Sequence, residues 1–218
     1  SEQHSNGACL SISPKTHGLM LTMGFGQGKQ QEFLTGKSFL PRQWYFVNAT
    51  YDAKTRNVTL TQEALHNHTK TKDSAKKKYK VRYSAIKKTN RIATIGACFL
   101  KHDKKRTVCQ HHYNGKIDSP VISSRALKPA EIEQLKYRPG QNLMSNDVVA
   151  AWDFSLDIKS VQVSDTSENR LIGRLVNMPA RAMTGWNWNG KEMNWRHAPD
   201  QYGAIHFHDD DIHDAGWE

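Results

Sequence analysis

The stretch WYFVNATYDAKTRNVTLTQ, residues 44–62, decides the fold class of this chain. Its first half alternates between two faces, with the period of two residues that is typical of a β-strand. One face carries Tyr45, Val47, Ala49 and Tyr51, and the other carries Trp44, Phe46, Asn48 and Thr50. The polar run DAKTRN, residues 52–57, then leads into VTLTQ. The pattern predicts an antiparallel β-hairpin with a six-residue connection.

Other short stretches of the chain have the same strand character. They are separated by clusters of glycine, asparagine, aspartate or lysine, and they cover residues 8–13, 18–24, 80–86, 93–100 and 107–113. Many short strands with polar turns favour an antiparallel sandwich, because a parallel sheet would need helical crossovers between its strands. We therefore expect an all-β fold, an antiparallel jelly-roll sandwich with one short helix and a less regular C-terminal segment.

The predicted helix lies in KPAEIEQLKYR, residues 128–138. Pro129 suits the first turn of a helix, and Glu131 lies near the positive end of the helix dipole. Ile132 and Leu135 form a short apolar face, so the helix can cover part of a core.

The composition changes after this helix, since five of the six tryptophans follow residue 150. We expect a domain boundary near residue 143, between a sandwich over residues 1–143 and a junction segment over residues 144–218. VVAAWDFS, residues 148–155, is a further candidate strand. It either returns to close the first sheet or begins a second sandwich, and the sequence leaves both possibilities open.

The net charge of +10 is concentrated in one segment. Between Lys70 and Arg91 there are ten Lys or Arg residues and one Asp. One interpretation is a solvated edge strand protected by lysines. The other is a basic face that docks an acidic partner, formed by Lys76, Lys77, Lys78, Lys80 and Arg82. Nucleic-acid binding is not favoured, because no recognition motif accompanies the charges.

Several catalytic motifs are incomplete or absent. GFGQGK, residues 24–29, lacks the strand and helix that would make it a phosphate loop, so Gly24, Gly26 and Gly28 are predicted to form a turn or bulge. The GxSxG elbow of serine hydrolases and the ExDxxE pair of sandwich-fold glycosidases are both absent. Cys109, His111 and His112 do not provide the four ligands of a structural zinc site.

The chain shows neither a membrane-spanning apolar run nor a signal peptide, so we expect a soluble, cytoplasmic protein. Cys9, Cys98 and Cys109 are odd in number and have no CxxC spacing, which favours buried reduced thiols. Both ends run directly into strand-like or charged sequence. We therefore expect a segment of a longer polypeptide.

The last thirteen residues, HFHDDDIHDAGWE at 206–218, are rich in metal-ligand side chains. On a strand, His206 and His208 would point the same way about 6.5 to 7 Å apart, close enough to share an ion. Asp210 would lie about 13 Å from His206, so it could join them only if the strand bends. Asp211, His213 or His197 are the other possible third ligands. A hydrogen-bonded junction surface is the alternative interpretation.

Two resemblances follow from longer stretches. HHYNGKIDSPVISSRALKPAEIEQL, residues 111–135, resembles the closing segment of laminin-G-like, concanavalin A-type sandwiches. Together with WYFVNATYD and TIGAC, this resemblance covers roughly residues 7–137. It implies a lectin-like sandwich, with one or two further strands before residue 1.

VVAAWDFS, GRLVNMPARAMTGWNWNG and WRHAPDQYGAIHFHDDDIHDAGWE resemble the large subunit of the N,N-dimethylformamidase family, and the order of these segments is kept over nearly the whole chain. The resemblance implies a bacterial hydrolase of small formamides whose iron is held by two tyrosines and a glutamate in a downstream domain. It implies no catalytic residue in this chain. It also implies a small subunit as partner and a hetero-oligomer.

Three hypotheses follow. The first is a noncatalytic, lectin-like segment that supports the catalytic domain and subunit assembly, with a junction formed by Trp186, Trp188, Trp195, His213 and Asp214. The second is a carbohydrate-binding module whose exposed tryptophans stack on sugar rings. The third is a metal hydrolase that uses His206 and His208.

Overall fold

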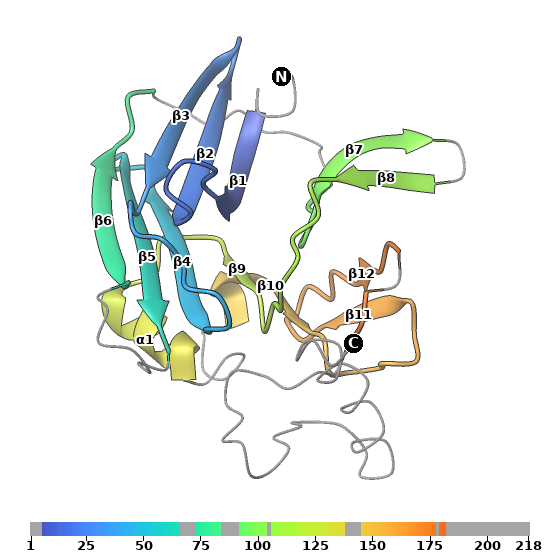
Figure 1. The fold of residues 1–218 in the computed structure, drawn as a ribbon. Helices are drawn as coiled ribbons and strands as arrows, with labels where there is room; N and C mark the ends of the chain where they lie inside the picture. Colours follow the sequence, from blue (N-terminus) through green and yellow to red (C-terminus); the bar gives the residue numbers. More distant parts are fainter. Residues whose placement is uncertain are drawn as a thin grey trace. The chain divides into compact units, whose positions relative to one another are not determined.

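The computed structural model describes residues 6–65, 73–83, 92–103, 106–137, 145–177 and 179–181 (Figure 1). The chain divides into two compact units. The first unit covers residues 1–113 with 125–127, and the second covers residues 114–124 with 128–218. The sequence-based boundary near residue 143 stays a prediction.

The first sheet of the first unit has three antiparallel strands, β1 (Asn6–Ile12), β2 (Leu19–Gly26) and β3 (Lys29–Leu34). The β2–β3 pairing shifts between Gly24 and Gly26, and both Gly26 and Gly28 have positive φ angles. Glycine adopts this conformation at little steric cost. The glycine-rich stretch is therefore a bulge and turn, as the sequence predicts.

The second sheet contains the predicted hairpin and is formed by β4 (Tyr45–Asp52), β5 (Asn57–Ala64) and β6 (Ala75–Lys80), in that order. The last pair between β4 and β5 is Asp52 with Asn57. The connection therefore covers residues 53–56 and is two residues shorter than the six-residue connection that the sequence predicts. The Asp52 carboxylate accepts hydrogen bonds from the Lys54 N–H (2.9 Å) and the Thr55 hydroxyl (2.7 Å). These bonds stabilise the tight turn.

The two sheets bury a common apolar core. Its buried members come from β2, β3 and β5 and from the residue that follows β6: Leu21, Met23, Phe25, Phe33, Val58, Leu60 and Val81. Phe33 packs on Tyr79 with ring centroids 5.5 Å apart, and Phe25 packs on Tyr83 at 5.0 Å. The predicted antiparallel all-β sandwich is confirmed. Its jelly-roll, concanavalin A-like connectivity stays a prediction.

Two strand predictions differ from the structure. Of the strand predicted over residues 80–86, only Lys80 lies in a strand among the residues that the structure describes, and residues 84–86 lie outside them. Lys80 is the last residue of β6, because an edge strand tolerates exposed lysines that resemble a loop in the sequence. β3 was not predicted, since KQQEFL lacks a run of β-branched residues. β7 (Cys98–Asp103) and β8 (Arg106–Gln110) form a separate antiparallel hairpin near the predicted positions.

The second unit contains a sheet of shorter strands in the order β12-β11-β10-β9. The strands are β9 (Val121–Ser123), β10 (Val148–Asp153), β11 (Gln162–Asp165) and β12 (Gly173–Arg174). β10 pairs with β9 and β11, and within the described parts it pairs with no strand of the first unit. A short 3-10 helix, η2 (Ser145–Asp147), precedes β10.

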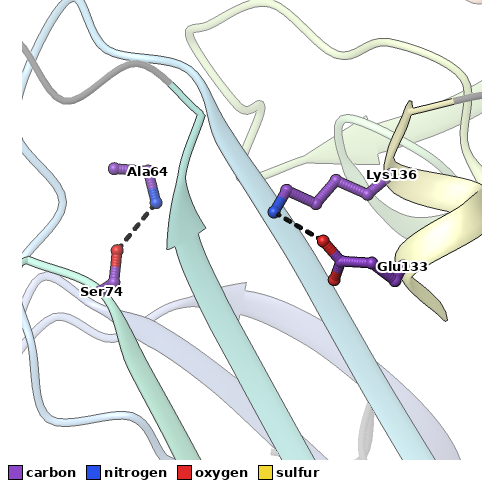
Figure 2. Close-up of polar contacts among 4 residues, drawn as sticks. All are labelled: Ala64, Ser74, Glu133 and Lys136. Atoms are coloured by element: carbon purple, nitrogen blue, oxygen red, sulfur yellow. Dashed lines mark hydrogen bonds and ion pairs between the residues drawn. The ribbon is translucent and has the colours of Figure 1, made fainter. Parts of the chain in front are cut away.

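The predicted helix is present as α1 (Pro129–Tyr137). The Glu131 carboxylate accepts a hydrogen bond from the Lys128 N–H at 2.6 Å, which caps the first turn. On the apolar face Leu135 is buried. Near the end of the helix, Lys136 forms an ion pair with Glu133 at 3.4 Å (Figure 2).

Polar side chains hold the short strands of the second unit. The Asp165 carboxylate accepts hydrogen bonds from the N–H groups of Ala151 (2.8 Å), Ser167 (2.9 Å) and Leu171 (2.7 Å), and from the Ser167 hydroxyl (2.8 Å). Burial alone would raise the pKa of Asp165, but these bonds outweigh burial and lower it.

Arg181 stabilises the loop between β10 and β11 through hydrogen bonds to its backbone. Its guanidinium donates hydrogen bonds to five backbone carbonyls, those of Phe154, Leu156, Asp157, Ser160 and Gln162. Burial lowers the pKa of Arg181, while Asp157 and Asp153 oppose this shift. The planar fork of arginine suits several carbonyls at once, so one side chain fixes the whole loop.

Candidate functional site

A buried amide organises one end of the sandwich. Gln62 on β5 is fully buried, and its Oε1 accepts hydrogen bonds from the Leu19 N–H (3.0 Å) and the Thr35 hydroxyl (2.8 Å). Its Nε2 donates to the carbonyls of Lys37 (3.1 Å) and Asp73 (3.0 Å). One side chain therefore fixes the end of β3 and the segment before β6 relative to each other.

Further hydrogen bonds hold the same two segments. The Tyr79 hydroxyl donates to the Leu34 carbonyl, and the Ser74 hydroxyl accepts from the Ala64 N–H at 3.0 Å (Figure 2). The Tyr45 hydroxyl donates to the carboxylate of Asp73, which is itself buried. Burial first, and then the Asp73 carboxylate, raise the pKa of Tyr45 to about 12.

These contacts surround an open hollow of about 500 Å³. Its walls are residues 34–37, at and after the end of β3, and residues 74–77 with Tyr79, which belong to or precede β6. Lys37, Lys76 and Lys77 line it, and no acidic residue does. Gly18 allows the Lys37 backbone to approach, because a Cβ at Gly18 would lie 1.9 Å from the Lys37 carbonyl oxygen. The hollow is therefore an open surface depression whose charged lining residues are all lysines.

The structure places all five residues of the predicted basic face, and all five are exposed: Lys76, Lys77, Lys78, Lys80 and Arg82. They do not share one face. Lys76, Lys78 and Lys80 pair with Thr61, Thr59 and Asn57 on the side of the sheet away from the core. Lys77 pairs with the buried Leu60 and so lies on the opposite side of the strand, where it lines the hollow together with Lys76. β6 therefore carries positive charge on both of its sides.

Sequence reasoning missed Gln62 and Asp73. Gln62 lies on the same face of β5 as the buried residues Val58 and Leu60, because side chains two positions apart point to the same side of a strand. A polar residue at a position where the alternation predicts burial was therefore the signal that could have identified it. Asp73 gave no such signal, because it lies in a lysine-rich segment and its role depends on Tyr45, 28 positions away.

The predicted metal ligands His206, His208 and Asp210 lie outside the described residues, as do the predicted junction residues Trp186, Trp188, Trp195, His213 and Asp214. In the described ranges, no three His, Cys, Asp or Glu side chains gather where they could hold an ion. The described residues therefore offer no such ligand cluster to the iron that the family resemblance implies, which that resemblance assigns to a downstream domain.

The three cysteines are free in the structure. Burial first, and then the neighbouring thiol of Cys98, raise the pKa of Cys9. This neighbour links β1 to the start of β7, a contact that the cysteine spacing did not indicate. Within the described parts, no helix is long and apolar enough to cross a membrane.

The decisive comparison is with curated proteins, since no protein-family model matches the chain. The chain is 33% identical over 215 residues to the N,N-dimethylformamidase beta subunit of an Alcaligenes species, covering 92% of this chain. This chain is similar to a segment of that subunit. The corresponding protein of Paracoccus aminophilus is 31% identical over 220 residues, again covering 92% of this chain. The chain spans only 28% of the length of either relative.

Proposed function

We propose that this chain is a noncatalytic β-sandwich segment of a dimethylformamidase-type subunit. In this proposal it supports the part of the polypeptide that hydrolyses N,N-dimethylformamide, or a similar small amide, to an amine and formate. The similarity to two dimethylformamidase beta subunits carries the proposal, because it covers nearly all of this chain but under a third of each relative.

The described residues support a structural role. Two buried polar side chains of the first unit, Gln62 and Asp73, bond to backbone and side-chain groups of the sandwich itself. A lectin-like identity, a large-subunit position, a cytoplasmic location and assembly with a smaller subunit are finer parts of the same proposal.

The experiment is a hydrolysis assay of the full-length protein with its partner subunit. Tyr45→Phe and Asp73→Asn each remove one partner of the hydrogen bond between the Tyr45 hydroxyl and the Asp73 carboxylate, two described groups that could transfer a proton. We expect kcat and KM for dimethylformamide to stay within about twofold of the wild type, while thermal stability falls because buried hydrogen bonds are lost. A loss of kcat in protein that keeps its metal content and subunit composition would contradict a noncatalytic role.

The carbohydrate-binding alternative depends on tryptophans outside the described residues, so it stays a prediction. The same holds for hydrolysis through His206 and His208. Metal analysis of a His206→Ala/His208→Ala variant of the full-length protein separates the second alternative from our proposal. We expect unchanged metal content, and loss of a stoichiometric ion would favour the histidine site instead.

A further inference from the structure

The edge of β6 combines open backbone groups with uncompensated positive charge. β6 pairs only with β5, so its other edge is not covered by a described strand. The Val81 N–H donates to the Arg56 carbonyl, which shows that the N–H and C=O groups of the odd-numbered residues here point toward β5. Those of Lys76, Lys78 and Lys80 consequently point outward.

One end of this edge is already occupied by a side chain. Gln31 on β3 donates from its Nε2 to the Lys80 carbonyl (3.2 Å), and its Oε1 accepts from the Arg82 N–H at 2.9 Å. The amide thus takes the hydrogen-bonding positions that a neighbouring strand would use. Lys76 and Lys78 have no such partner among the described residues, so the open part of the edge is the part beside the hollow.

The charges at this open part are unpaired. Across the sheet, Lys76 and Lys78 face the neutral side chains of Thr61 and Thr59. In the described ranges neither lysine forms an ion pair. Lys77 and Lys37 add positive charge on the side of the hollow. A segment lying along the edge would therefore meet ammonium groups on both of its faces.

We propose that the β6 edge at residues 76–78 binds an extended acidic segment of a partner protein, which pairs with it as an additional strand. Main-chain hydrogen bonds supply the affinity in this mode, and alternate side chains supply the specificity. Lysines on an edge strand repel a second copy of the same edge, so they prevent self-association. The same lysines favour a strand that alternates carboxylates, because the two charge patterns are complementary.

This inference goes beyond the proposed function and does not depend on it, because strand addition requires no amide hydrolysis. A nucleic acid would satisfy the charges but offers no strand backbone to pair with Lys76 and Lys78. The backbone therefore distinguishes the two classes of partner. The experiment must separate charge from main-chain pairing.

The probe is a synthetic peptide that alternates glutamate and threonine, titrated into the full-length protein at low salt. We expect saturable binding, together with slower amide hydrogen exchange in residues 73–83. A peptide with lysine in place of glutamate should not bind. Methylation of alternate peptide nitrogens should weaken binding at least about tenfold, because it removes main-chain donors while leaving the charge unchanged.

Lys78→Glu should weaken binding of the acidic peptide at least about tenfold, since it places a like charge at the centre of the edge. Lys15→Glu, an equal charge change at an exposed residue of the β1–β2 connection, is the matched control and should leave binding unchanged. Equal binding of the methylated and unmethylated peptides would overturn strand addition. No binding, or binding insensitive to Lys78→Glu, would overturn the site.

Discussion

The two units of the chain are stabilised in different ways. In the first unit, two three-stranded sheets bury apolar side chains against each other, and Phe33, Val58 and Leu60 are at most 1% exposed. In the second unit, strands of two to six residues are held by Asp165 and Arg181, which bond to backbone groups of the loops between them. Long strands can rely on an apolar face, whereas short strands need side chains that replace missing backbone partners.

The largest effect is expected from the apolar core of the first unit. Phe33→Ala should lower the free energy of unfolding by about 4 kcal/mol, because it leaves a cavity between the sheets. Urea denaturation followed by circular dichroism measures this loss. Ile122→Ala on β9 is the control, since that side chain is 43% exposed and its removal should cost under about 1 kcal/mol. Similar losses for both variants would remove the distinction between the units.

The next largest effect is expected from Asp165, whose hydrogen bonds hold the short strands of the second unit. Asp165→Asn keeps the shape but turns an acceptor into a donor facing N–H groups, so we expect a loss of about 2 kcal/mol. Hydrogen exchange should accelerate in residues 148–174 and stay unchanged in residues 19–34. Glu168→Gln, at an exposed position of the same unit, is the control and should change neither region.

The contribution of Asp165 to the stability of the fold depends on pH in a defined direction. The folded pKa of Asp165 is lowered from 3.8, so its contribution is complete above that value and is lost as the pH falls through the lower folded pKa. Acid-induced acceleration of exchange in residues 148–174 should therefore be weaker in Asp165→Asn than in the wild type. If the two proteins were equally sensitive to acid, groups other than Asp165 would cause the acid-induced acceleration of hydrogen exchange.

The smallest effect concerns Tyr45 in the first unit. Its pKa is raised from 10.0 to about 12, so its contribution to stability is complete below pH 10 and is lost as the pH rises toward 12. Tyr45→Phe should flatten the alkaline fall in melting temperature and cost about 1 kcal/mol at neutral pH. Tyr113→Phe is the control, because Tyr113 is 46% exposed. An unchanged alkaline profile in Tyr45→Phe would contradict the assignment.

The difference between the units also explains what the sequence could predict. The register of β4 against β5 follows from the alternation of Tyr45, Val47, Ala49 and Tyr51, because an apolar face allows only one pairing phase. The α1 helix was predicted from Pro129 and Glu131, which act within one turn. Both signals are local, so a single sequence contains them.

The candidate site was predicted only in part. The charge of residues 76–82 identified a basic surface, but the direction of the individual lysines required the pairing of β6 with β5. The hollow depends on Gln62, whose four partners come from three other segments of the chain. Periodicity within one strand contains no information about such distant partners.

Gln62 also has a consequence for the order of folding. The hairpin of β4 and β5 can form from neighbouring residues alone, but Leu19 lies 43 positions from Gln62 in the sequence. Until the two sheets dock, the amide can remain hydrated. Docking in a shifted register would bury it without its partners, at a cost of about 1 to 3 kcal/mol for each unsatisfied group. The buried amide of Gln62 therefore favours the native alignment of the two sheets, because a shifted alignment leaves its hydrogen-bonding groups unsatisfied.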